Sequence, residues 1–126
     1  MADPKAVQRL AEQARSFAQT VRCLADVSGD RIQRAHKLYQ AFCREGYHAL
    51  LVPAAFGGRG LDALSAGTVF ETLSKGAPGT LHGPLTTTHC AFMVMSGMQN
   101  SHHKRFLRTL AGKHAPAAFC LTEESA

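Results

Sequence analysis

The first part of the chain carries an apolar stripe that only a packed helix can bury. Its members recur at spacings of three and four residues, which places them on one face of a helix over about residues 5–26. The polar positions between them fall on the other face. A helix of this kind needs a partner for its apolar face. The stripe consists of Val7, Leu10, Ala14, Phe17, Val21 and Leu24.

Four further helices are predicted from similar stripes and from residues that start and stop helices. Either Ser28 or Asp30 is suited to cap the second helix and Asp62 to cap the third, and Gly46 and Gly112 are suited to end the second and fifth. Short connections favour antiparallel neighbours. We therefore predict an all-α fold, an orthogonal or antiparallel bundle of about five helices. The last four are expected between residues 30–46, 62–75, 84–96 and 100–111.

Several side chains are expected to face the core of this bundle. The segment Cys90–Met95 is apolar on all sides, which predicts a fourth helix buried on most of its surface. The four cysteines form no C-x-x-C pair, so they are predicted to be small buried residues in a reducing compartment. The other expected inward residues are Ile32, Ala35, Leu38, Tyr39, Phe42, Leu64, Val69, Leu73, Phe106, Leu107 and Leu110.

Composition and charge exclude several classes of protein. The 126-residue chain has 45% hydrophobic residues, enough for one modest core. No apolar run is long enough to cross a membrane, and no secretion signal precedes the first helix, so we expect a cytoplasmic protein, or a mitochondrial-matrix protein in a eukaryote. The net charge is +5, and no carboxylate lies between Glu71 and Glu123. This basic region could attract phosphates, but no nucleic-acid-binding signature accompanies it, so no nucleic acid is expected.

Few residues suggest catalysis or metal binding. The glycines at 57, 58 and 60 lack the spacing of a phosphate-binding loop and predict a tight turn with positive φ. Glu71 has no second acid nearby. His89 and Cys90 are neighbours on a helix and diverge by about 100°. The same divergence argues against a metal site at His102 and His103. We therefore predict no catalytic residue and no metal site in the chain.

The end of the chain has a different pattern. Residues 117–126 alternate small or apolar side chains and then turn polar, which predicts a short buried strand leading into a loop. This places a boundary between a helical domain at residues 1–115 and the beginning of a β domain at residues 116–126.

Two motifs resemble the acyl-CoA dehydrogenase superfamily. The first is the connector from Gly46-Tyr47 through Val52-Pro53 to Phe56-Gly57-Gly58-x-Gly60-Leu61-Asp62. The second is the ending Phe119-x-Leu121-Thr122-Glu123, which resembles the first strand of the family's middle β domain. The resemblance covers nearly the whole chain from about Phe17 onward. It implies the N-terminal helical domain and a truncated middle domain, a fragment about a third the length of a full member.

The resemblance also implies a cofactor and two groups of site residues. Members of the family use FAD and α,β-dehydrogenate an acyl-CoA thioester, and their catalytic glutamate lies in a later domain. Phe119, Leu121 and Thr122 would contact FAD, with the Thr122 hydroxyl at the flavin edge. The positions that resemble the wall of the acyl cavity are Leu81, Leu85 and Thr88, whose spacing puts them on one helix face.

Partners and alternatives follow from the same resemblance. The expected partners are an acyl-CoA substrate and an electron-accepting flavoprotein or oxygen, and a full-length member is expected to be a homo-oligomer. The fragment alone is expected to be inactive. A flavin monooxygenase or a nitroalkane oxidase on the same fold remains an alternative. A non-enzymatic helical domain, whose basic face binds an acidic partner, is another.

Overall fold

The computed structural model describes residues 3–25, 30–97 and 100–118, and within these ranges the chain is all-α. It contains five α-helices and two short 3-10 helices, with no strand in the described residues, as the sequence predicts. The α-helices are α1 (Pro4–Ala25), α2 (Arg31–Arg44), α3 (Ala63–Gly76), α4 (His82–Ser96) and α5 (Ser101–Lys113). The 3-10 helices are η1 (Tyr47–Ala49) and η2 (Ala54–Phe56).

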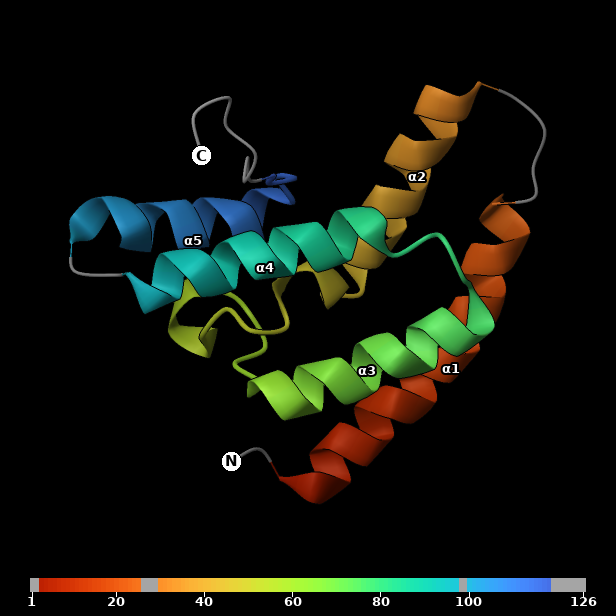
Figure 1. The fold of residues 1–126 in the computed structure, drawn as a ribbon, viewed down its shortest axis with the longest axis horizontal. Helices are drawn as coiled ribbons and strands as arrows, with labels where there is room; N and C mark the ends of the chain where they lie inside the picture. The colour runs from red at the N-terminus through yellow and green to blue at the C-terminus, as the bar shows by residue number, and fades with distance from the viewer. Residues whose placement is uncertain (1–2, 26–29, 98–99, 119–126) are drawn as a thin grey trace, which may run out of the picture.

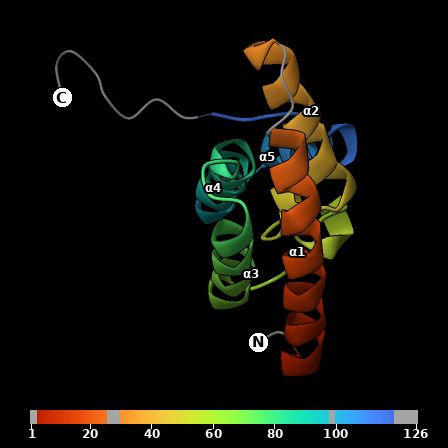
Figure 2. The ribbon, with the colours of Figure 1, turned by 90° about the vertical axis from the view of Figure 1, so that its right-hand side faces the viewer.

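The helices form two groups joined by the segment between α2 and α3. Figure 1 shows α1 beside α3, and α4 beside α5, with α2 rising behind the N-terminal end of α4. Figure 2 shows α3 and α1 as neighbours from the side as well. α3 and α4 run in opposite directions, as do α4 and α5, which agrees with the expectation from short connections.

The main core lies where α1, α2, η1 and α3 meet. An aromatic cluster fills its centre: the Phe17 ring lies 5.2 Å from both the Phe42 and the Tyr47 ring centroids, edge-on to Phe42. Edge-to-face aromatic pairs contribute beyond the area they bury. α1 approaches α3 closely because small residues lie between them. A Cβ added to Gly76 would lie only 2.5 Å from the Cβ of Ala18.

A second core lies under α5. Leu107, Leu110 and Ala111 of that helix pack with Val52 and Ala91. The side chains of Leu107 and Leu110 are fully or almost fully buried. α5 is thereby fixed against α4 and against the segment that follows α2. The predicted inward face of the fifth helix is correct at these two leucines.

The glycine-rich connector is a tight turn, as predicted. Gly57 and Gly60 have positive φ angles of 92° and 63°. Three backbone amides close the turn: Arg59 N donates to Ala49 O at 3.1 Å, and Gly60 N and Leu61 N donate to Val52 O and Leu50 O at 2.8 and 2.9 Å. Amides used in this way are not free to cradle a phosphate.

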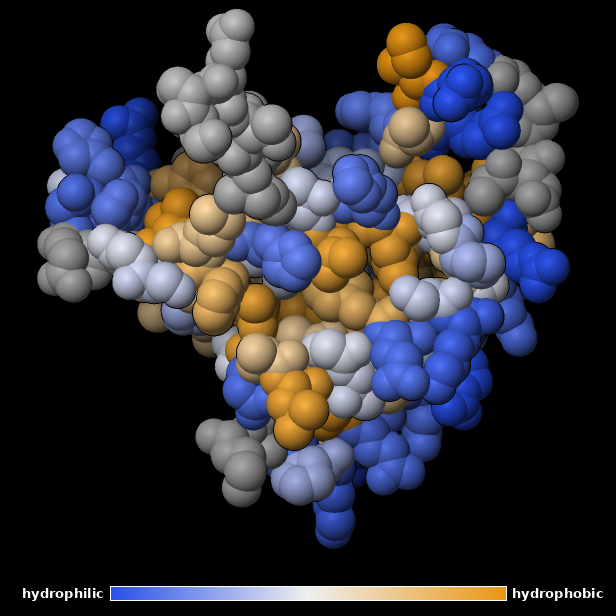
Figure 3. Space-filling model, viewed as in Figure 1, coloured by the Kyte–Doolittle hydropathy of each residue, from blue (hydrophilic) through white to orange (hydrophobic). Residues whose placement is uncertain are grey.

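Several side chains lie further outside than the sequence predicts. Ile32 and Leu64 are 79% and 84% exposed, and Phe92 and Met93 of α4 about half exposed, at 49% and 50%. Phe106 is exposed too. The expectation that α4 is buried on most sides is therefore wrong. Its neighbours α2, α5 and η1 leave part of its surface uncovered, and Figure 3 shows apolar side chains on this face.

Two smaller predictions also differ from the structure. α5 continues through Gly112 to Lys113, and His114 takes the left-handed position that ends it, with a φ of 53°. Cys43 and Cys90 are buried as expected, whereas Cys23 is exposed on α1, away from the apolar stripe. Of the two caps considered for the second helix, the structure uses Asp30, which accepts a hydrogen bond from Ile32 N at 3.1 Å.

Residues 119–126 of the predicted strand lie outside the described residues, and residues 117 and 118 carry no strand assignment, so the domain boundary near residue 115 stays a prediction. No helix in the described part of the chain is long and apolar enough to cross a membrane.

Candidate functional site: an apolar pocket between α3 and α4

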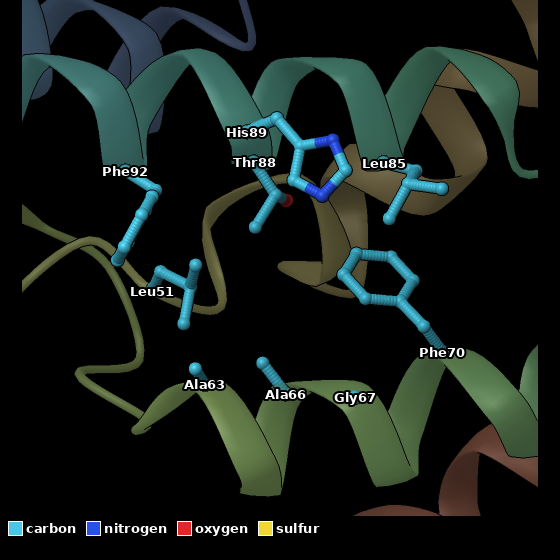
Figure 4. Close-up of a pocket in the computed structure, with 9 residues that line it drawn as sticks. All are labelled: Leu51, Ala63, Ala66, Gly67, Phe70, Leu85, Thr88, His89 and Phe92. Carbon is cyan, nitrogen blue, oxygen red and sulfur yellow. The ribbon is translucent and has the colours of Figure 1, made fainter.

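A pocket of about 260 Å³ lies between α3 and α4. Figure 4 shows its residues facing one another across the gap between the two helices. Of the nine lining residues, only two have polar side chains, so the pocket is suited to apolar ligand groups. They are Leu51, Ala63, Ala66, Gly67, Phe70, Leu85, Thr88, His89 and Phe92.

The α3 wall is lined mostly by small residues. The helix begins at a well-formed cap, because the Asp62 side chain accepts a hydrogen bond from Ser65 N at 2.9 Å. One turn later, Ala66 and Gly67 face the pocket. A Cβ added to Gly67 would meet no atom within 4 Å. A side chain at this position would therefore occupy space that is open beside the pocket.

Thr88 is a buried member of the α4 wall whose hydroxyl is already engaged. Its Oγ1 donates to Pro84 O at 2.9 Å and to His48 O at 3.2 Å. Both partners are carbonyl oxygens, so the single hydroxyl proton is shared between them. This side chain holds α4 against η1.

The structure brings two of the three predicted substrate-binding residues together. Leu85 and Thr88 both line the pocket. Leu81 instead belongs to the main core, together with residues of α1 and α3. It lies at the start of α4, where the chain enters the helix, and does not line this pocket. The contact of Leu85 and Thr88 with a substrate stays a prediction.

Other lining residues were missed by the sequence analysis. His89 lies four residues after Leu85, and Phe92 four residues after Thr88, so the positions 85, 88, 89 and 92 form one helix face. That periodicity could have identified them. Leu51 and Phe70 come from other elements, and no local pattern links them to α4.

A second, polar pocket of about 240 Å³ lies on the other side of the connector, beside His48. His48 is almost fully buried, with 2% of its surface exposed, and its Nε2 lies 3.3 Å from Ala111 O. Since a carbonyl only accepts, Nε2 carries the proton, and Nδ1 is left without a partner. Burial is the main cause that lowers the pKa of His48, and the nearby His114 ring lowers it further.

Two other titratable groups in the described part of the chain have shifted pKa values with simple causes. Glu71 is exposed and pairs with Lys75 at 2.6 Å, and this hydrogen bond lowers the pKa of the carboxyl. Burial raises the pKa of Cys43 to about 11, which keeps the thiol protonated and unreactive at neutral pH. Within residues 3–25, 30–97 and 100–118, no cluster of three or more potential ligands could hold a metal.

The predicted flavin contacts Phe119, Leu121 and Thr122 lie outside the described residues. The segment immediately before them is attached to the helical body. Ala117 N donates to Thr87 Oγ1 at 3.3 Å, and the Tyr39 hydroxyl lies 3.3 Å from the same oxygen. Thr87 belongs to α4 and is fully buried. This contact fixes where the chain leaves the helices.

The fold and the pocket define a small helical domain with an apolar cleft between two of its helices. A family model described as the N-terminal domain of acyl-CoA dehydrogenases matches residues 4–114. The chain therefore belongs to the acyl-CoA dehydrogenase family through this domain. No curated protein and no solved structure matches it.

The family depends on FAD, but the described residues do not form a site for that cofactor. The amides of the glycine-rich turn are used within the turn, and the α3–α4 pocket is small and apolar. FAD carries a charged pyrophosphate that needs free donors. The α3–α4 pocket thus offers apolar contacts rather than the donors that a pyrophosphate needs.

Proposed function

We propose that this chain forms the N-terminal helical part of an FAD-dependent acyl-CoA dehydrogenase. The α3–α4 pocket would receive the apolar part of the acyl group. The observation that carries this proposal is the pocket itself: seven apolar residues line it, inside the part of the chain that matches the family.

The size and lining of the pocket support a short apolar chain as ligand. Each methylene that leaves water for an apolar environment contributes about 0.8 kcal/mol. Four buried methylenes would thus contribute about 3 kcal/mol before the cost of ordering the chain. Leu51, Phe70 and Phe92 supply the larger contact surfaces.

The reaction in this proposal is the α,β-dehydrogenation of an acyl-CoA thioester. It needs a base for the α proton, which in the family is a glutamate, and no carboxylate lines the pocket. The role of this domain is therefore to bind and position the acyl group. Phe119, Leu121 and Thr122 remain proposed contacts to FAD, and an electron-accepting flavoprotein or oxygen remains the proposed acceptor.

The binding role can be tested on the chain itself with two glycine variants. Gly67 faces the pocket, whereas Gly112 lies on α5, and a Cβ at either position meets no atom within 4 Å. Gly67→Phe should fill the pocket and weaken octanoyl-CoA binding at least several-fold in calorimetric titration. Gly112→Phe should bind like the wild type. Equal binding by both variants would contradict an acyl site between α3 and α4.

The dehydrogenase reaction is tested on the full-length enzyme with FAD bound, because the helical part alone is expected to carry no flavin. Anaerobic addition of a saturated acyl-CoA should bleach the flavin absorbance, and the enoyl-CoA product should appear in equal amount. Bleaching by nitroalkanes but not by acyl-CoA would favour a nitroalkane oxidase on the same fold. Oxygen-dependent hydroxylation after reduction by a nicotinamide would favour a monooxygenase.

A further inference from the structure

We propose that His89 selects acyl groups that carry an oxygen acceptor, preferably a carboxylate, at the end that enters the α3–α4 pocket. This inference rests on the proposed function, because it concerns the ligand of the same pocket. The inference goes beyond the proposed function because it names a selecting residue and a class of acyl group. Figure 4 shows the His89 imidazole pointing from α4 into the space above Phe70.

His89 is the lining side chain with hydrogen-bonding capacity to spare. The only other polar one, Thr88, gives its proton to two carbonyl oxygens. No hydrogen bond or ion pair of the His89 ring is found in the described residues. His89 is exposed, so water can satisfy its ring while the pocket is empty, and a purely apolar acyl chain lying against the ring would displace that water without replacing its hydrogen bond. An oxygen acceptor on the ligand would satisfy it.

The charges around the pocket favour an anionic acceptor. α4 has no carboxylate, nor does the segment between Gly46 and Leu61 that provides Leu51. On α3, Glu71 is paired with Lys75 at 2.6 Å, and Asp62 accepts a hydrogen bond from Ser65 N. No unpaired carboxylate on these elements competes for the imidazole. A ligand carboxylate beside His89 would accept a charge-assisted hydrogen bond from the imidazole N–H.

The inference is tested by comparing octanoyl-CoA with suberoyl-CoA, which has a carboxylate in place of the terminal methyl group. The measured quantity is the ratio of the two dissociation constants, obtained by calorimetric titration of the chain. His89→Phe keeps a ring of similar size and removes both nitrogens. It should shift the ratio about tenfold toward octanoyl-CoA, as expected for loss of one charge-assisted hydrogen bond. His102→Phe, an exposed ring on α5, should leave the ratio unchanged.

A second readout separates hydrogen bonding from a structural effect. In an NMR titration, suberoyl-CoA should shift the ring nitrogen signals of His89, as a new hydrogen bond to a carboxylate would, and octanoyl-CoA should not. An unchanged ratio in His89→Phe, or ring nitrogen signals of His89 that suberoyl-CoA leaves unchanged, overturns the inference. If Gly67→Phe still weakens both ligands, the acyl site itself stands. If Gly67→Phe weakens neither, the acyl site is wrong and the inference falls with it.

Discussion

Two glycine-to-alanine substitutions should change the stability of this domain in opposite directions. Gly58 lies in the glycine-rich turn, and a Cβ there would come within 2.1 Å of Val52 O and 2.4 Å of Val52 Cβ. Gly67 lies within α3, where a Cβ meets nothing within 4 Å. The same methyl group is therefore added once to a filled space and once to an empty one.

The magnitude at Gly58 follows from what must move. Val52 is fully buried in the second core, and its carbonyl accepts the 2.8 Å hydrogen bond from Gly60 N that closes the turn. Forcing an extra methyl group into packed surroundings costs about 1–3 kcal/mol. Disturbing the hydrogen bond adds about 1 kcal/mol. We expect Gly58→Ala to lower the free energy of unfolding by about 2–4 kcal/mol.

Gly67→Ala should instead raise the free energy of unfolding by about 0.5–1 kcal/mol. Glycine within a helix is less favourable than alanine by this amount, mainly because it loses more backbone entropy on folding. Urea unfolding followed by circular dichroism measures both variants, with the slope m expected to stay constant. A Gly58→Ala protein within about 0.5 kcal/mol of the wild type would refute the steric argument.

Three further outcomes are expected. Burial lowers the pKa of His48 below its ordinary 6.5 in the folded protein, so on acidification the unfolded chain protonates this histidine first. The free energy of unfolding should therefore keep this contribution above pH 6.5 and fall by up to about 1.4 kcal/mol per pH unit below it. Acid unfolding of His48→Gln should lack this component, and that of His102→Gln should keep it. Thr87→Val should speed hydrogen exchange at Ala117 N, whereas the adjacent Thr86→Val should not. The chain purified alone should show no flavin absorbance, and a bright yellow preparation would contradict this.

The helices and their caps could be predicted because their causes are local. Asp30 and Asp62 accept hydrogen bonds from amides two and three residues ahead, so the capping sequence identifies Asp62 and narrows the other cap to Ser28 or Asp30. The glycine-rich turn was predictable for the same reason. The end of α5 was not, because His114 takes the left-handed position that glycine normally occupies.

Exposure and pocket formation could not be predicted in the same way, because they depend on neighbours. Leu64 has the spacing of a core residue but is 84% exposed. Cys23 is exposed because it lies off the apolar face of α1. The pocket needs Leu51 and Phe70 beside α4, and both are distant from it in sequence. The resemblance to the family predicted Leu85 and Thr88 near a ligand, and the fold adds His89 to their face.

Gly67 connects the stability of the domain with its proposed function. A glycine there weakens α3 relative to alanine, yet no neighbour requires its small size. The space it leaves opens into the α3–α4 pocket. Binding sites commonly carry residues that cost stability. If Gly67→Ala stabilises the domain and also weakens octanoyl-CoA binding while Gly112→Ala does not affect binding, the glycine serves the ligand. If binding is unchanged, the pocket does not depend on this position, and its wall must be sought at Leu85 and Phe92.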